Sequence, residues 1–90
     1  MKYVMFYELA DDGRSKAPLY FPAHRARFEG FHARGHLLMC GPLTDLEGGA
    51  LGIFTTREAA EEFIREDPFV VKGVVRDWHV REWNEVLVGP

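Results

Sequence analysis

The sequence at residues 2–9 reads KYVMFYEL, and it decides the fold because it predicts a strand with two apolar faces. Tyr3, Met5 and Tyr7 alternate with further apolar side chains, so residues that favour strands point to both sides of the backbone. A strand of this kind is typical of the middle of a sheet, where both faces are covered. The stretch therefore predicts a central strand at the start of the chain.

A polar loop and a helix are expected to follow this strand. Asp11 and Gly13 break the apolar pattern, and the loop is predicted to run to about Pro18. The helix is predicted at residues 20–34, with a proline in its first turn, where the missing N–H costs nothing. Gly35 stands just past its predicted end.

Two short strands with a turn between them are expected next. Residues 36–43 are mostly apolar, but they contain Pro42, which predicts an edge strand or a bulge. Residues 43–49 contain Asp and Gly at turn positions and predict a hairpin loop. Residues 50–54 predict the third strand.

The last part of the chain predicts a second helix and a fourth strand. Thr55 with Glu58 three residues later matches a capping box at the helix start. The helix should end before Pro68, because the residue that precedes a proline is pushed out of the helical region. Residues 74–83 predict the strand, and the apolar tail at 85–90 is expected to pack against the body.

The resulting order, βαββαβ, predicts an α+β fold of the ferredoxin-like type. It consists of a four-stranded antiparallel sheet with helices on one face, in a single domain over residues 1–90. Helices on one face leave the other face of the sheet bare. Two such sheets can cover each other in a homodimer, so a second copy of the chain is the expected partner.

Composition and charge exclude several classes of function. With 47% hydrophobic and 28% charged residues in 90, the chain has globular composition. Its net charge is −3 without a basic stripe, so nucleic acid is not expected as a partner. No apolar run approaches membrane-spanning length, so no membrane partner is expected and the predicted location is cytoplasmic. The single cysteine, Cys40, is interpreted as a small buried hydrophobe.

Several common catalytic motifs are absent from the sequence. The four histidines do not occur in HxH or HExxH spacing, and a CxxC pair is absent, so no metal site is expected. The glycines at 48–52 match neither a phosphate loop nor a dinucleotide fingerprint. The lone serine, Ser15, is not part of a nucleophile elbow. No cofactor is predicted.

His24 and Asp67 remain as candidates for chemistry. His24 lies within the apolar stripe of the first helix, between Phe21 and Phe28. A histidine beside a carboxylate can act as a general base near neutral pH. The alternative is a core histidine bonded to a backbone carbonyl, and Asp67 alone can be an ordinary helix-ending residue. Periodicity does not decide between these interpretations.

The chain resembles the YCII-related family along nearly its whole length. The resemblance rests on an ordered set of segments: Tyr7-Glu8, the helix with His24, Gly41-Pro42, Gly48-Gly49, Gly52-Ile53-Phe54, Asp67-Pro68-Phe69, Gly73-Val74 and Trp83-Asn84. It implies a ferredoxin-like fold assembled as a dimeric α/β barrel. It also implies a pocket with His24 and Asp67 as catalytic residues, and with Tyr7, Phe28, Gly41 and Pro42 around the substrate.

The expected function is a small-molecule lyase or isomerase without a cofactor. In this hypothesis His24 moves a proton, and Asp67 orients the imidazole and stabilises its charged form. Two alternatives stay open: a non-catalytic domain that binds a small molecule in the same pocket, and a purely structural dimerisation domain. An open cavity at His24 favours the first two functions, and a filled core favours the third.

Overall fold

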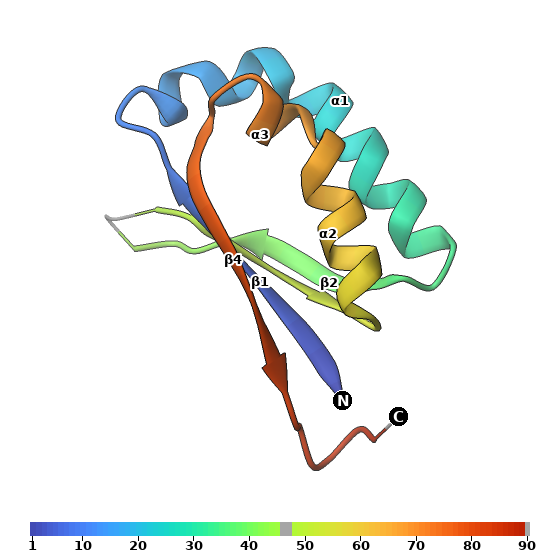
Figure 1. Ribbon diagram of the computed structural model, residues 1–90. Coiled ribbons are helices and arrows are strands. Elements are labelled where there is room, and N and C mark those ends of the chain that lie inside the picture. Colours follow the sequence, from blue (N-terminus) through green and yellow to red (C-terminus); the bar gives the residue numbers. More distant parts are fainter. Residues whose placement is uncertain (46–47, 90) are drawn as a thin grey trace.

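The computed structural model of the chain describes residues 1–45 and 48–89, with four strands in one antiparallel sheet (Figure 1). The spatial order is β2-β3-β1-β4, which is the order of a ferredoxin-like sheet. The first strand therefore lies between two others, as its sequence predicts. The strands are β1 (Lys2–Leu9), β2 (Leu37–Pro42), β3 (Ala50–Phe54) and β4 (Val75–Trp83).

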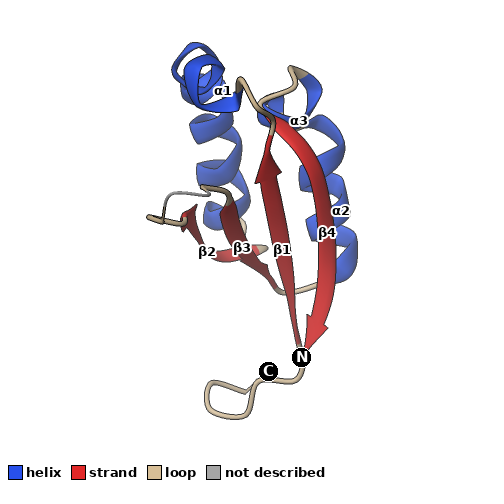
Figure 2. Cartoon of the chain, turned by 90° about the vertical axis from the view of Figure 1, so that its left-hand side faces the viewer, coloured by secondary structure: helices blue, strands red, loops and turns tan. Residues whose placement is uncertain are grey.

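Helices cover one face of the sheet, and Figure 2 shows the strands from the other side. The helices are α1 (Gly13–Ala33), α2 (Arg57–Glu66) and the single turn α3 (Pro68–Val71). Together with the strands they confirm the predicted α+β architecture. In the described part of the chain, no helix combines the length and the apolar character that crossing a membrane requires.

Helix α1 begins at Gly13 rather than at residue 20, so the loop predicted up to Pro18 is wrong. The prediction placed Pro22 in the first turn, whereas in the structure Pro18 and Pro22 both lie inside the helix, where each removes a hydrogen-bond donor. A backbone hydrogen bond stabilises the first turn of the helix, in which the carbonyl of Asp12 accepts the N–H of Lys16 at 3.1 Å. The two side chains also form an ion pair at 3.6 Å.

Helix α2 is capped by Thr56, not by Thr55 as the sequence pattern predicts. The hydroxyl of Thr56 accepts the N–H of Ala59 at 3.0 Å, which satisfies one of the free donors of the first turn. Glu58 is then the second helical residue and not the third, so the reciprocal capping box is absent. The predicted helix end is correct, because Asp67 has extended geometry (φ −65°, ψ 124°).

Strand β2 lies at the edge of the sheet, which agrees with the prediction from Pro42. The register between β2 and β3 also shifts near the start of β2, between Leu37 and Met39. Residues 46 and 47 of the predicted hairpin loop lie outside the described residues. Next to them, Gly49 has φ +92°, a backbone conformation that residues other than glycine rarely adopt.

The core lies between the helices and the sheet. Met5 and Tyr7 of β1 point into it, and rings of α1, α2 and β3 pack against one another there. Phe31 and Phe63, for example, meet edge to face with ring centres 5.2 Å apart. The buried members are Met5, Tyr7, Phe31, Leu37, Phe54, Ala59, Ala60, Phe63, Ile64 and Val75.

The C-terminal tail differs from its prediction. Residues 85–89 are tied to the start of β1 by polar contacts, but their apolar side chains do not pack against the body. The exposed fractions are 86% for Val86, 95% for Leu87 and 81% for Val88. The tail of a single chain is thus ordered without being buried.

Candidate functional site

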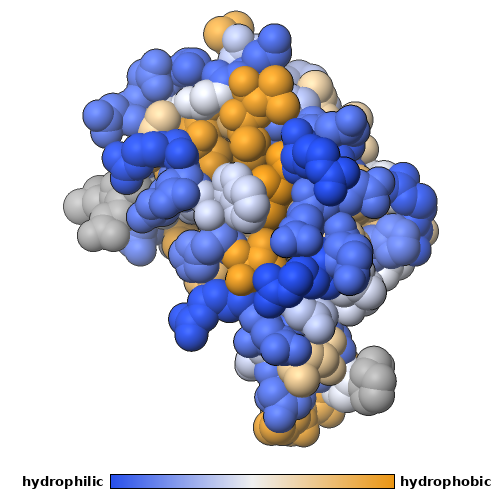
Figure 3. Space-filling view, viewed as in Figure 1, coloured by the Kyte–Doolittle hydropathy of each residue, from blue (hydrophilic) through white to orange (hydrophobic). Residues whose placement is uncertain are grey.

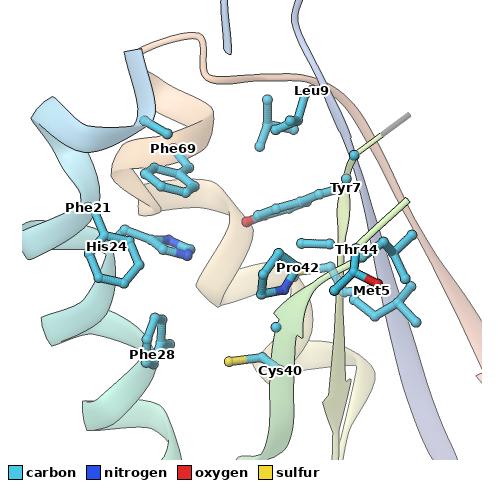
Figure 4. Close-up of a pocket in the computed structure, with 18 of the residues that line it drawn as sticks. Met5, Tyr7, Leu9, Phe21, His24, Phe28, Cys40, Pro42, Thr44 and Phe69 are labelled. Atoms are coloured by element: carbon cyan, nitrogen blue, oxygen red, sulfur yellow. The ribbon is translucent and has the colours of Figure 1, made fainter. Parts of the chain in front are cut away.

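A cavity of about 550 Å³ lies between α1 and the sheet (Figure 4). Helix α1 provides one wall, with His24 between Phe21 and Phe28, and the sheet provides the opposite wall. The cavity is therefore lined mainly by rings and aliphatic groups. All four residues predicted to surround a substrate line it: Tyr7, Phe28, Gly41 and Pro42.

His24 is held in place by aromatic rings on several sides. Its ring stacks on Phe69 of α3 with centres 3.8 Å apart and planes only 5° from parallel. Phe28, one turn further along α1, contacts it edge to face at 5.2 Å. These contacts leave the imidazole little freedom to rotate, and 14% of the side chain is exposed.

Asp67 lies behind His24 and is fully buried. Its position between α2 and α3 follows from Pro68, which ends one helix and begins the next. One carboxylate oxygen, Oδ1, lies 2.7 Å from His24 Nδ1 and accepts the N–H of Phe69 at 3.2 Å. The other, Oδ2, accepts the hydroxyl of Tyr7 at 2.6 Å. Three donors thus converge on one buried acidic group.

The bond to Asp67 occupies one ring nitrogen of His24, Nδ1, and leaves Nε2 as the other. A carboxylate can only accept hydrogen bonds, so Nδ1 of His24 carries the proton and donates it. In the neutral imidazole, the second nitrogen, Nε2, then holds a lone pair. Among the residues that the structure describes, none forms a hydrogen bond to this nitrogen. Nε2 is therefore the ring nitrogen of His24 that has no partner among the described residues.

Tyr7 keeps its proton in this arrangement. Burial raises the pKa of Tyr7 far above its ordinary value, and the negative charge of Asp67 raises it further. The hydroxyl therefore acts as a donor to Asp67 at all pH values near neutrality. Tyr7 was predicted to line a pocket, which it does, but its bond to Asp67 was not predicted.

Cys40 lines the cavity on the sheet side and is exposed, so its predicted burial in the core is wrong. The side chain faces the open cavity instead of the packed core, and its strand partner Gly52 has no side chain to cover it. Partial burial of the thiol raises its pKa, and the negative charge of Asp67 raises it further. The thiol is thereby kept in its neutral form.

His32 and His79 have other partners and do not contact Asp67. His32 Nδ1 bonds to the carbonyl of Leu37 at 2.7 Å, beyond the end of α1. His79 stacks on Phe6 with ring centres 4.7 Å apart, on the face of the sheet without helices. Within residues 1–45 and 48–89, no cluster of His, Cys, Asp and Glu side chains could hold a metal ion.

The structure brings His24 and Asp67 together, and their predicted hydrogen bond is present. Asp67 was expected to border the cavity, but it does not. It is connected to the cavity only through His24. The stacking of Phe69 on His24 was missed, although Phe69 stands two residues after Asp67 in the motif that carried the resemblance. Catalytic roles for the pair stay predictions.

Comparison with known protein sequences identifies a family and two curated relatives. The YCII-related domain matches residues 1–84 of the chain. The protein named YciI from Escherichia coli O6:H1 is 31% identical over 98 aligned positions, which cover 97% of this chain and all of the relative. The protein YciI of Shigella flexneri matches with the same figures.

A solved structure shares the fold. It is 5-chloro-2-hydroxyhydroquinone dehydrochlorinase from Burkholderia phenoliruptrix AC1100, in complex with 2,5-dihydroxybenzoquinone. The TM-score is 0.80 over 96% of each chain, and the sequence identity is 18%. At this identity the likeness concerns the fold, and it confirms the ferredoxin-like arrangement of helices and sheet.

Proposed function

The chain belongs to the YCII-related family, and we propose that it is a small-molecule lyase or isomerase with His24 and Asp67 as its proton-transfer pair. The observation that carries the proposal is the bond between the buried Asp67 and a histidine that lines an apolar cavity. A merely structural histidine needs no cavity beside it. This favours a site over the dimerisation domain considered from sequence.

The mechanism starts with His24 as a general base. Nε2 takes a proton from a carbon or hydroxyl group of the bound molecule, and the imidazole becomes positively charged. Asp67 stabilises this charge through the bond at 2.7 Å, and Tyr7 holds the carboxylate from its other oxygen. Because Asp67 is fully buried, no water competes for these bonds.

The electron pair left behind determines the type of reaction. In a lyase, this pair forms a new double bond while a neighbouring leaving group departs with its own bonding pair. In an isomerase, the pair shifts within the molecule, and the imidazolium returns the proton to a different atom. Both reactions balance without an oxidant or a cofactor.

The walls of the cavity favour a small, flat substrate. Phe21 and Phe28 offer ring faces and edges on the helix side, and Pro42 lies opposite (Figure 4). Apolar walls with a few polar groups suit a compound that has one ring and few charges. The structural neighbour is named for such a compound and holds a dihydroxybenzoquinone.

The test is a reaction with a ring compound as probe. We expect the wild-type chain to release chloride from 5-chloro-2-hydroxyhydroquinone faster than buffer, measured by ion chromatography. His24→Gln should lower this rate by about 10²–10⁴-fold, as is typical for the loss of a general base. His79→Gln is the matched control, because His79 lies on the other face of the sheet, and it should retain the wild-type rate.

A non-catalytic binding function is the alternative, and the apolar lining of the cavity favours it equally. Binding of 2,5-dihydroxybenzoquinone at the cavity, seen as NMR shift changes at Phe28 and Tyr7, separates the two functions. Binding without any chloride release above the buffer rate would contradict the lyase and leave the binding domain.

We further propose that the chain acts as a homodimer in the cytoplasm. The support for the dimer is the sheet face that carries no helix, where half-buried Val4 and Phe6 of β1 stand beside Ile53 of β3. A second copy can cover these side chains with the same face of its own sheet. The location follows from the sequence arguments alone.

A further inference from the structure

The last described residues of the chain form a short, well-defined segment, which we call the C-terminal arm (residues 84–89). The carboxylate of Glu85 accepts the backbone N–H groups of three following residues, at 2.7 Å from Gly89, 2.8 Å from Val88 and 3.1 Å from Leu87. Lys2 pairs with Glu85 at 3.5 Å and also donates to the carbonyl of Gly89. The arm is thereby folded onto the start of β1.

The arm displays its apolar side chains to solvent. Val86, Leu87 and Val88 are the most exposed large apolar residues of the described chain, at 81–95%. Figure 3 shows strongly apolar atoms at the lower end of the molecule, where Figure 1 places this segment. Ordering a backbone costs about 1–2 kcal/mol per residue, and here no burial of these side chains offsets it in a single chain. This favours a surface that is completed by another molecule.

The arm is continuous with the sheet face that carries no helix. Side chains alternate along β1, so Lys2 points to the same side as Val4 and Phe6. Because Lys2 holds Glu85 and Gly89, the arm lies at the end of this face. Any molecule that covers the face therefore meets the arm as well.

The total exposed area indicates how much surface is left to cover. A folded monomer of 10.3 kDa typically exposes about 5,400 Å². This chain exposes 6002 Å². The excess of about 600 Å² approaches the area of about 800 Å² that each partner buries in a standard interface.

We propose that the C-terminal arm of each chain packs against the uncovered sheet face of a second copy. The inference rests on the dimer proposed above and names the segment that joins the two copies. Each chain carries both the apolar arm and an apolar face with Met39, which is 67% exposed on β2, so two identical contacts form around one twofold axis.

The test is Leu87→Asp, followed by analytical ultracentrifugation over a range of micromolar concentrations. Leu87 is 95% exposed, so the substitution leaves the single chain intact, which circular dichroism verifies. We expect the dissociation constant of the dimer to rise by at least about tenfold, because the substitution removes the free energy gained by burying a leucine side chain in the interface. Leu19→Asp is the matched control: this leucine of α1 is 75% exposed and should leave dimerisation unchanged.

The possible results separate this inference from the proposals on which it rests. If Leu87→Asp dimerises as tightly as the wild type, the arm has no part in the interface, while the dimer stands. A wild-type chain that is monomeric at these concentrations overturns both. Chloride release from the probe compound, measured in parallel, reports on the cavity and is independent of either outcome.

Discussion

At the scale of single residues, Asp67 links the fold to the proposed chemistry. Its backbone ends α2 and begins α3, and its side chain accepts hydrogen bonds from His24, Tyr7 and Phe69. The three donors come from different elements, so one carboxylate connects the first strand, the long helix and the single turn α3. The same bonds that stabilise this junction also fix the tautomer of His24.

Two substitutions of Asp67 should separate these structural and chemical roles. In Asp67→Asn, the amide oxygen can take the place of Oδ1 and accept from both His24 and Phe69. The amide nitrogen then donates to the hydroxyl of Tyr7, which can turn to accept. His24 and Phe69 keep their acceptor and only the Tyr7 hydroxyl loses its own, so we expect a loss of about 1–2 kcal/mol in the free energy of unfolding. The negative charge is lost, so chloride release should fall at least about tenfold.

Asp67→Ala should behave differently, because three buried donors lose their acceptor. At about 1–3 kcal/mol for each, the free energy of unfolding should fall by roughly 3 kcal/mol or more. Urea denaturation of both variants measures the difference. Equal stability of Asp67→Asn and Asp67→Ala would contradict the assigned hydrogen bonds.

At the scale of elements, the start of α2 lies one residue away from the position that the local sequence pattern predicts. Thr55 and Thr56 are adjacent and both can cap a helix, and Glu58 favoured the first on sequence grounds. In the structure the hydroxyl of Thr56 accepts the N–H of Ala59 at 3.0 Å. Thr55 instead donates weakly to the carbonyl of His36 at 3.5 Å, in the turn that joins β3 to α2.

This assignment predicts unequal effects for two neighbouring substitutions. Thr56→Ala should lower the free energy of unfolding by about 1 kcal/mol, the usual contribution of a capping side chain. Thr55→Ala should lower it by less than about 0.5 kcal/mol, because the bond it removes is long and exposed. The midpoints of urea denaturation provide the comparison. A larger effect at Thr55 would show that the sequence pattern identified the cap correctly.

The elements that sequence predicted well are those whose signals are local. Alternation along β1, the proline in β2 and Pro68 after α2 each act within a few residues, and the structure agrees with all of them. Helix α1 was predicted too short because the polar residues after β1 indicate a loop and Pro22 indicates a first helical turn. Its first turns are stabilised by contacts that the pattern does not contain.

At the scale of the whole molecule, contacts between distant segments were beyond what periodicity can show. His24 and Asp67 are 43 residues apart, and their expected meeting came from a family resemblance and not from spacing. The bond between Tyr7 and Asp67 joins residues 60 positions apart and was not foreseen. The fold places β1 beneath α1 and α3, and this arrangement brings the side chains of Tyr7, His24 and Asp67 together.

The proposed dimer should be visible in the thermal stability of the whole molecule. When a dimer unfolds to two separate chains, dilution favours the unfolded state, so the unfolding temperature depends on protein concentration. For a chain of 90 residues, we expect it to rise by about 5 °C or more over a hundredfold increase in concentration. Light scattering at the upper concentration should report about twice the mass of 10.3 kDa. A mass of one chain, together with an unfolding temperature that is the same at every concentration, would mean that the sheet face is stable in water without a second copy.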